Sequence, residues 1–195
     1  MIYNEEFLGL LAKDRVIGDF PPFNNGNINE VEIYIKTIIG RLKDNYQIIV
    51  EPDYTYYGSG FASYISVKIS KKDKSDTRTT HEKNRVTEWT QGLLLYVSNL
   101  APYWYYGASD WTVSTENGKY VGGSAEFLGP DSINDIDYEL WKTEIEKIKI
   151  LFHQFRYNLL TKEELEKQVG FDLSIRTVLA DKPYKVFDFF FHWED

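Results

Sequence analysis

The sequence predicts an α+β fold, in which an antiparallel sheet packs against a few amphipathic helices, as a single domain over residues 1–195. Three observations predict it. Segments with apolar residues at every second position occur beside segments whose apolar residues recur at helical spacing. Hydrophobic residues make up 43% of the chain and charged residues 27%, as in globular proteins. The 195 residues suffice for a hydrophobic core and contain no linker, repeat or low-complexity tract.

The N-terminal part predicts two helices. The first covers residues 5–13 and is followed by a Pro- and Gly-rich break at residues 19–26. The second carries an apolar stripe at helical spacing, formed by Val31, Tyr34, Ile35, Ile38, Ile39 and Leu42. Asn29 is expected to cap this helix, with Glu32 three residues later in the position of a capping box.

Two strands are predicted next. Residues 47–51 form the first, which Pro52 ends, and residues 54–60 form a loop. Residues 61–70 alternate between apolar and polar side chains, which predicts a half-buried strand. The charged and polar stretch 71–85 predicts an exposed hairpin loop.

The segment 86–100 is ambiguous. Its apolar residues fit a helix, whereas its threonines, glycine and valine favour an extended chain, and we interpret residues 92–98 as a strand. Further strands are predicted at residues 103–106 and 111–115, joined through Gly107.

A tight hairpin is predicted after these strands. Asn117-Gly118 is typical of a type I′ turn, and it leads into a partner strand over residues 119–127. Together the strands predict an antiparallel sheet.

The second half is predicted to be mainly helical. A long helix over residues 137–160 carries the stripe Trp141, Ile145, Ile148, Phe152, Phe155 and Leu159. Thr161 and Glu164 form a capping box for a short helix that Gly170 stops. The aromatic stretch 184–193 predicts a terminal strand with Phe187, Phe189, Phe191 and Trp193 on one face, and we expect it to lie in the core.

Composition and charge exclude several classes. The chain has no cysteine, so disulfides, thiolate catalysis and cysteine metal sites are excluded. Its net charge of −8 disfavours nucleic acid and suits a basic protein partner, although an acidic surface also simply favours solubility. The start has no basic, apolar signal segment, and no stretch approaches the roughly 18 apolar residues of a membrane span. We therefore expect a cytoplasmic protein without membrane contacts.

No catalytic, cofactor-binding or metal site is predicted. The histidines His81, His153 and His192 are far apart in sequence, so we expect structural or solvent-exposed roles for them. Gly58-Ser59-Gly60 has the composition of a nucleophile elbow but precedes a strand instead of a helix, so it is interpreted as a turn.

Two clusters are candidates for contact with a partner. The first is a run of aromatic rings and the second an acidic group before the long helix; the predicted binding residues are Tyr103, Trp104, Tyr105, Tyr106, Asp110, Trp111, Asp131 and Asp135. Tyr and Trp are enriched at binding hot spots. The pattern itself favours the interior of a two-sided sheet for these rings. It likewise favours stabilisation of a helix N-terminus by the carboxylates, by about 0.3–1 kcal/mol each.

Two stretches resemble bacterial polymorphic-toxin immunity proteins. They are LLYVSNLAP at residues 94–102, followed by Tyr106-Gly107, and PYKVFDFFFHWED at residues 183–195. The resemblance implies a small, acidic, cytosolic protein that binds one cognate toxin and blocks its active site. It implies no catalytic residues.

The expected function is therefore a non-enzymatic inhibitor that neutralises a cognate toxin. The alternative is a small-molecule-binding domain or enzyme with an aromatic pocket, suggested by the density of rings between Tyr103 and Trp111. A structural or scaffold protein is a third hypothesis, which the oligomeric state would separate from the others.

Overall fold

The molecule is built on a mostly antiparallel sheet, described here from a computed structural model that covers residues 3–45, 47–58 and 60–194. The strand order is β1-β3-β5-β6-β7, with β4 beside β5 and β8 beside β6. These strands are β1 (Ile48–Asp53), β3 (Tyr64–Lys71), β4 (Thr77–Glu82), β5 (Arg85–Ser98), β6 (Tyr103–Glu116), β7 (Lys119–Ala125) and β8 (Asn158–Leu159). A separate ribbon pairs β2 (Phe61–Ala62) with β9 (Trp193–Glu194). The predicted α+β fold class is confirmed.

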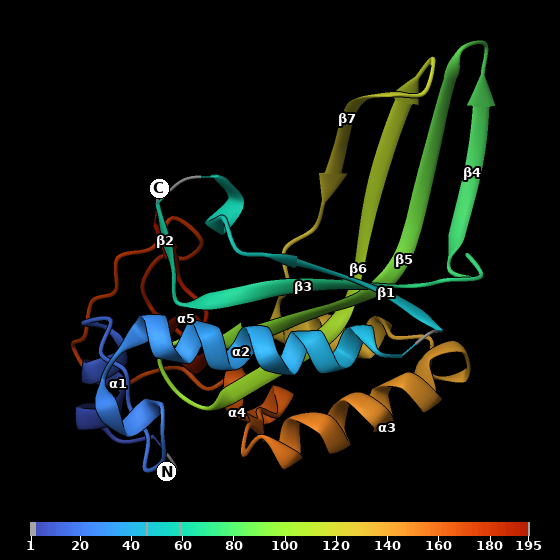
Figure 1. Cartoon of the computed structure of the whole chain (residues 1–195). Coiled ribbons are helices and arrows are strands. Elements are labelled where there is room, and N and C mark those ends of the chain that lie inside the picture. Colours follow the sequence, from blue (N-terminus) through green and yellow to red (C-terminus); the bar gives the residue numbers. More distant parts are fainter. Residues whose placement is uncertain (1–2, 46, 59, 195) are drawn as a thin grey trace.

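Helices cover both faces of the sheet (Figure 1). One core lies under α2 (Ile28–Lys43) and α3 (Tyr138–Gln154). The other lies under α1 (Glu5–Leu11), α4 (Lys162–Leu165) and α5 (Val186–Phe190). No helix in the described part of the chain is both long and apolar enough to cross a membrane.

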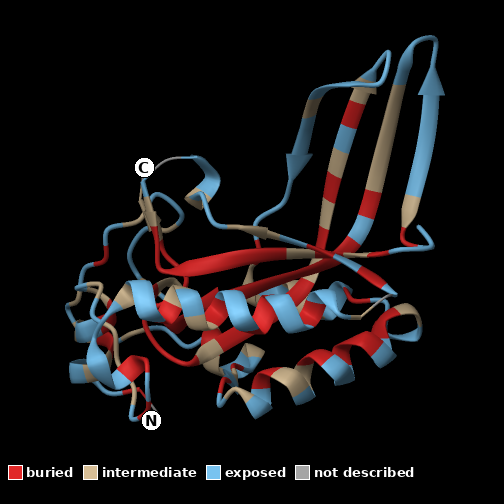
Figure 2. Ribbon diagram, viewed as in Figure 1, coloured by how far each residue is buried: buried red, intermediate tan, exposed pale blue. Residues whose placement is uncertain are grey.

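The two cores follow from the alternation of side chains along the central strands. Leu93 and Leu95 of β5 point into the core under α2 and α3, whereas Leu94 and Tyr96 point into the other. Figure 2 shows the central strands buried between the helical layers. The strand β3 is therefore covered on both faces over most of its length, and the prediction of a half-buried strand over residues 61–70 is wrong.

The helix α2 forms as its apolar stripe predicts, but its cap differs. The side chain of Asn27 accepts a hydrogen bond from the Asn29 backbone N–H at 3.1 Å, so Asn27 is the capping residue and Asn29 is already inside the helix. The predicted first helix is confirmed as α1, with Asn4 as its cap.

A four-stranded arm projects from the body of the molecule (Figure 1). It consists of β4, the first half of β5, the second half of β6, and β7, and we define it as residues 77–91 and 110–125. Most of its side chains are exposed or half-buried, and the few buried ones are Thr90 and Trp111 near its base and Ser114 farther out (Figure 2). The predicted hairpin turn is confirmed, because Asn117 and Gly118 both have positive φ, at 49° and 75°.

Three strand predictions in this region are wrong in extent. The stretch 71–85 contains the strand β4 instead of being only a loop, because its polar residues pair with β5 through the backbone. The strand predicted at 92–98 begins at Arg85. The two strands predicted at 103–106 and 111–115 are one continuous strand, β6.

Gly107 does not break β6 but allows a close contact. A Cβ at this position would lie 2.6 Å from the Cβ of Ser132, in the short 3₁₀ segment η3 (Pro130–Asp135). The absence of a side chain lets η3 pack directly on the strand. Two further 3₁₀ segments are η1 (Phe23–Asn25) and η2 (Tyr56–Gly58).

Two element ends also differ from prediction. Pro52 lies inside β1, which runs to Asp53; β1 is an edge strand paired with β3 alone, so a proline is tolerated there. The long helix ends at Gln154, and residues 158–159 form β8 instead of its last turn. The capping box of Thr161 and Glu164 is confirmed at the start of α4.

The C-terminal aromatic segment is buried, but it is not a strand over residues 184–193. Residues 186–190 form α5, and only Trp193 and Glu194 are extended, in β9. Phe189, Phe190 and Phe191 are all buried. Consecutive rings are therefore buried on all sides of a helical turn. The predicted alternation of rings between two faces of a strand is wrong.

Candidate partner-binding site

Most rings of the aromatic run lie inside the molecule. Trp104 stacks on Phe152 with ring centroids 4.3 Å apart, and the hydroxyl of Tyr105 donates a hydrogen bond to the Pro130 carbonyl at 2.6 Å. Tyr106 is buried, and the half-buried Tyr103 packs on Phe190 in the other core.

These four residues were predicted to contact a partner. The structure instead agrees with the alternative hypothesis, in which they form the interior of a two-sided sheet. Tyr103 keeps a partly exposed edge, but Trp104, Tyr105 and Tyr106 could not contact a partner without disrupting the cores.

The predicted acidic residues separate into two groups. Asp131 forms an ion pair with Lys162 at 2.7 Å, and this bonded lysine holds the pKa of the Asp131 carboxyl below its usual value. Asp110 and Asp135 instead lie close enough to interact. Burial raises the pKa of Asp110, and the charges of Glu126 and Asp135 raise it further.

A hollow of about 280 Å³ lies beside this second group, at the junction of the arm and the body. We call it the acidic hollow; its wall includes Trp89, Gln91, Asp135, Asp137, Leu140 and Trp141. The arm supplies Trp89 and Gln91, while η3 and the start of α3 supply the rest. Asp110 pairs with Gln91 across β5 and β6 and so lies next to the hollow.

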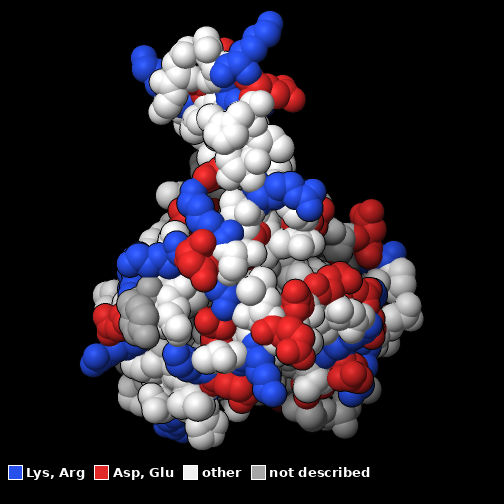
Figure 3. Space-filling model, turned by 90° about the vertical axis from the view of Figure 1, so that its right-hand side faces the viewer, with Lys and Arg blue, Asp and Glu red and all other residues white. Residues whose placement is uncertain are grey.

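Acidic side chains gather on the body below the arm on this side of the molecule (Figure 3). The carboxylate of Asp137 accepts hydrogen bonds from the Glu139 and Leu140 backbone N–H groups and caps α3. Part of its hydrogen-bonding capacity is therefore used within the chain. Asp135 is exposed and forms no hydrogen bond or ion pair within the described chain. It is therefore the carboxylate most available to a partner.

A buried ion pair supports the wall behind Trp141. Lys71 and Glu144 are 2.8 Å apart, and the ammonium of Lys71 also lies 4.6 Å from the centre of the Trp141 ring. The backbone N–H of Lys71 donates to the carboxylate of Asp76 at 2.8 Å. These contacts fix the end of β3, the loop after it and the indole of Trp141 in one arrangement.

The chemistry of the hollow suits a cation. The half-buried indole of Trp89 offers a surface for cation–π contact, and the nearby carboxylates offer acceptors for a guanidinium or ammonium group, whereas Trp141 is buried beneath the hollow. One arginine is already present: Arg78 stacks over Trp89 at 5.7 Å.

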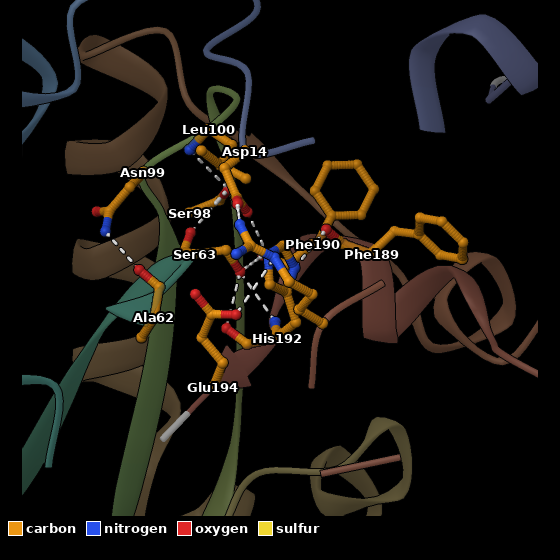
Figure 4. A network of polar contacts seen from close by, with 11 residues as sticks. Asp14, Ala62, Ser63, Ser98, Asn99, Leu100, Phe189, Phe190, His192 and Glu194 are labelled. Atoms are coloured by element: carbon orange, nitrogen blue, oxygen red, sulfur yellow. Dashed lines mark hydrogen bonds and ion pairs between the residues drawn. The ribbon is translucent and has the colours of Figure 1, made fainter. Parts of the chain in front are cut away.

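The polar network at the chain ends is structural. His192 binds Asp14 through Nε2 at 2.8 Å, while its Nδ1 lies 3.3 Å from the Phe189 carbonyl (Figure 4). The hydroxyl of Ser63 accepts from the backbone N–H of His192, not from its ring. Ser63 is thus outside hydrogen-bond contact with the imidazole, and the set lacks the nucleophile–base contact of a catalytic triad.

The remaining predicted positions carry no assembled chemistry. His81 and His153 are exposed, and Ser59 lies outside the described residues. Within the ranges that the structure describes, no three His, Asp or Glu side chains are placed to hold a metal ion.

A second and larger cavity lies on the opposite face of the sheet. It measures about 590 Å³ and includes Trp111 together with Tyr54, Tyr57 and Phe127; we call it the aromatic cleft. Leu93 lines the hollow and Leu94 lines the cleft, and successive residues of a strand point to opposite faces.

The sequence predictions missed most residues of both cavities. Trp89 and Trp141 appeared only as members of apolar patterns, and Tyr54 and Tyr57 only as part of a loop. Comparisons of the chain with protein-family models, with curated proteins and with solved structures found no match.

Proposed function

We propose that the protein binds and blocks a basic partner protein, in the manner of the toxin-neutralising immunity proteins that its sequence resembles. The observation that carries this proposal is the position of the acidic hollow at the base of a projecting arm. A partner that contacts the arm also meets Trp89 and Asp135.

Charge supports a basic partner. The chain carries a net charge of −8, and Asp110 and Asp135 repel one another at the hollow, as the raised pKa of Asp110 indicates after the effect of burial. A lysine or arginine side chain in the hollow would relieve this repulsion. Complementary charge would also accelerate the encounter, and the indole of Trp89 would contact the bound side chain.

The arm adds a surface that reaches beyond the hollow. Its outer strands β4 and β7 each pair with one neighbour in the described chain, so the outer edge of each is open. Tyr120 on β7 is 70% exposed, and Val121 beside it is also exposed. Exposed apolar side chains on an open strand are typical of contact surfaces for another protein.

The test begins with the product of the neighbouring gene, which is the usual source of a cognate toxin. The purified proteins are mixed, and their dissociation constant is measured by calorimetry for the wild type, for Asp135→Asn and for Asp181→Asn. Asp181 is also exposed, so both variants lose one surface charge. We expect Asp135→Asn to weaken binding about tenfold and Asp181→Asn to leave it nearly unchanged.

Two results would count against the proposal. One is a neighbouring gene whose product is a housekeeping protein that does not bind. The other is binding that Asp135→Asn and Asp181→Asn affect equally, because the hollow would then have no special part in it.

A second candidate function is supported by the aromatic cleft. Its volume of about 590 Å³ and its four aromatic side chains fall within the usual range of small-molecule sites. We therefore propose small-molecule binding as the alternative function, carried by a different face of the sheet from the acidic hollow.

A further inference from the structure

The aromatic cleft has a wall of rings from distant parts of the chain. Trp111 comes from β6, Tyr54 and Tyr57 from the segment after β1, and Phe127 from the segment after β7. Tyr57 and Phe127 meet edge to face with centroids 5.3 Å apart. A planar apolar group entering the cleft would therefore find aromatic surface on several sides.

Two polar groups of β3 point into this apolar surface. Ser66 and Lys68 are two residues apart on the strand, so both side chains lie on the same face, and both line the cleft. The ammonium of Lys68 lies 5.6 Å from the centre of the Trp111 ring. A cation thus lies next to the largest ring of the cleft, and a hydroxyl lies two residues away on the same face of the strand.

Neither group has a hydrogen-bond partner within the described chain. Ser66 is only 6% exposed, yet its hydroxyl forms no hydrogen bond. Lys68 forms no hydrogen bond and no ion pair, and its contact is the cation–π interaction with Trp111. Both donors line the cleft and remain free to bind an acceptor that enters it from outside the chain.

One carboxylate of the cleft is already occupied by hydrogen bonds within the chain. The side chain of Asp53 accepts hydrogen bonds from the Thr55 backbone at 2.7 Å, the Thr55 hydroxyl at 2.7 Å and the Tyr57 backbone at 2.9 Å. It attracts Lys68 through its charge but forms no ion pair with it. With Glu51 and Glu126 also at the cleft, a ligand with several negative charges would be repelled.

We propose that the cleft binds a small planar aromatic molecule that carries one carboxylate. The ring lies against Trp111 and its aromatic neighbours, and the carboxylate accepts from Lys68 Nζ and Ser66 Oγ. This inference rests on the alternative function proposed above, and it does not depend on partner binding at the acidic hollow.

The test compares three ligands of one shape by calorimetry: 3-phenylpropionate, its neutral amide 3-phenylpropanamide, and phenethylamine. We expect saturable binding of 3-phenylpropionate at one site, about tenfold weaker binding of the amide, and weaker binding still of the amine. Lys68→Met should reduce the affinity for 3-phenylpropionate about tenfold. Lys72→Met, at an exposed position beyond the end of β3, should leave it unchanged.

Folding is checked by thermal unfolding of each variant, and Ser66→Ala provides a second, smaller change with the same expected direction. Equal binding of the three ligands, or equal effects of Lys68→Met and Lys72→Met, would overturn the carboxylate assignment but leave small-molecule binding in place. If none of the three ligands binds at millimolar concentration, both the assignment and the alternative function are wrong.

Discussion

The indole of Trp111 occupies the space where a side chain on Gly92 would lie. A Cβ on Gly92 would stand 2.1 Å from Cη2 of Trp111 and 2.5 Å from the carbonyl oxygen of Ile69. The glycine in the middle of β5 is therefore required by a neighbouring ring, and that ring forms part of the aromatic cleft.

Gly92→Ala should displace Trp111 and lower the free energy of unfolding by about 1–3 kcal/mol, the usual cost of an overpacked position. Chemical denaturation measures the loss. The matched control is Gly40→Ala in α2, where an added Cβ meets nothing within 4 Å. This variant should raise the free energy of unfolding by about 0.5–1 kcal/mol, because alanine favours the helix over glycine. Equal effects at the two glycines would contradict the contact.

A second prediction concerns the ion pair between Lys71 and Glu144, whose side chains are only 9% and 6% exposed. Glu144→Ala leaves a buried ammonium without its carboxylate and should cost about 3–5 kcal/mol of stability. Replacing both residues by Met should cost much less, because no buried charge remains. Urea unfolding of the single and double variants measures the difference.

The exposed pair of Arg41 and Asp44, 4.0 Å apart, serves as the control for this prediction. Breaking it by Asp44→Ala should change stability by less than about 1 kcal/mol. If Glu144→Ala were as mild as Asp44→Ala, water would have to reach the buried pair.

The C-terminal aromatic core can be tested at Phe190. The ring is fully buried and packs against Tyr3 and Tyr103, with centroids 5.2 Å and 5.1 Å away. Phe190→Ala should lower the free energy of unfolding by about 3–5 kcal/mol through lost burial and a new cavity. Tyr120→Ala on the arm removes an exposed ring and should change stability by less than about 0.5 kcal/mol.

Local patterns predicted the elements that depend on local interactions. The stripes of α2 and α3, the turn at residues 117–118 and the capping box at residues 161–164 each need only nearby residues. The strand β4 carries no apolar alternation, because its side chains are mostly exposed and pairing with β5 alone holds it. A search for apolar periodicity in the sequence could therefore not predict this strand.

The candidate sites could be predicted only in part, because both are assembled from distant segments. Asp110 and Asp135 were identified as acidic residues, but the hollow beside them also needs Trp89 and Trp141, which lie 52 positions apart in the chain. In the C-terminal segment, the density of rings predicted burial. It did not predict the helix α5, because rings that are buried on every side leave no period of two or of 3.6.

The contact of Asp14 with His192 predicts sensitivity to acid. Burial of the Asp14 carboxyl opposes ionisation, but hydrogen bonds and charges from His192 and Arg176 outweigh it and hold its pKa below the usual 3.8. Since the folded pKa lies below the unfolded one, Asp14 contributes stability above about pH 4, and this contribution is lost as the pH falls through the folded pKa.

Asp14→Asn should therefore lower the free energy of unfolding at pH 7, and its stability should fall less steeply than that of the wild type below pH 4. Denaturant unfolding at a series of pH values measures both effects. Asp181→Asn is the control, because Asp181 is exposed and has no ion pair within the described chain. Parallel stability curves for the wild type and Asp14→Asn would contradict the role of this contact.

The pKa of Asp110 is shifted in the opposite direction to that of Asp14, and the residue lies beside the acidic hollow. Burial, followed by the charges of Glu126 and Asp135, raises its pKa above the usual value, so its ionised form destabilises the fold at neutral pH and this cost disappears as the pH falls. Asp110→Asn should raise the free energy of unfolding at pH 7 by less than about 1 kcal/mol.

The same variant should weaken binding of a basic partner, because it removes one of the charges beside the acidic hollow. Unfolding and calorimetry on one preparation measure both quantities. A variant that is more stable and binds equally well would show that the carboxylate of Asp110 takes no part in binding.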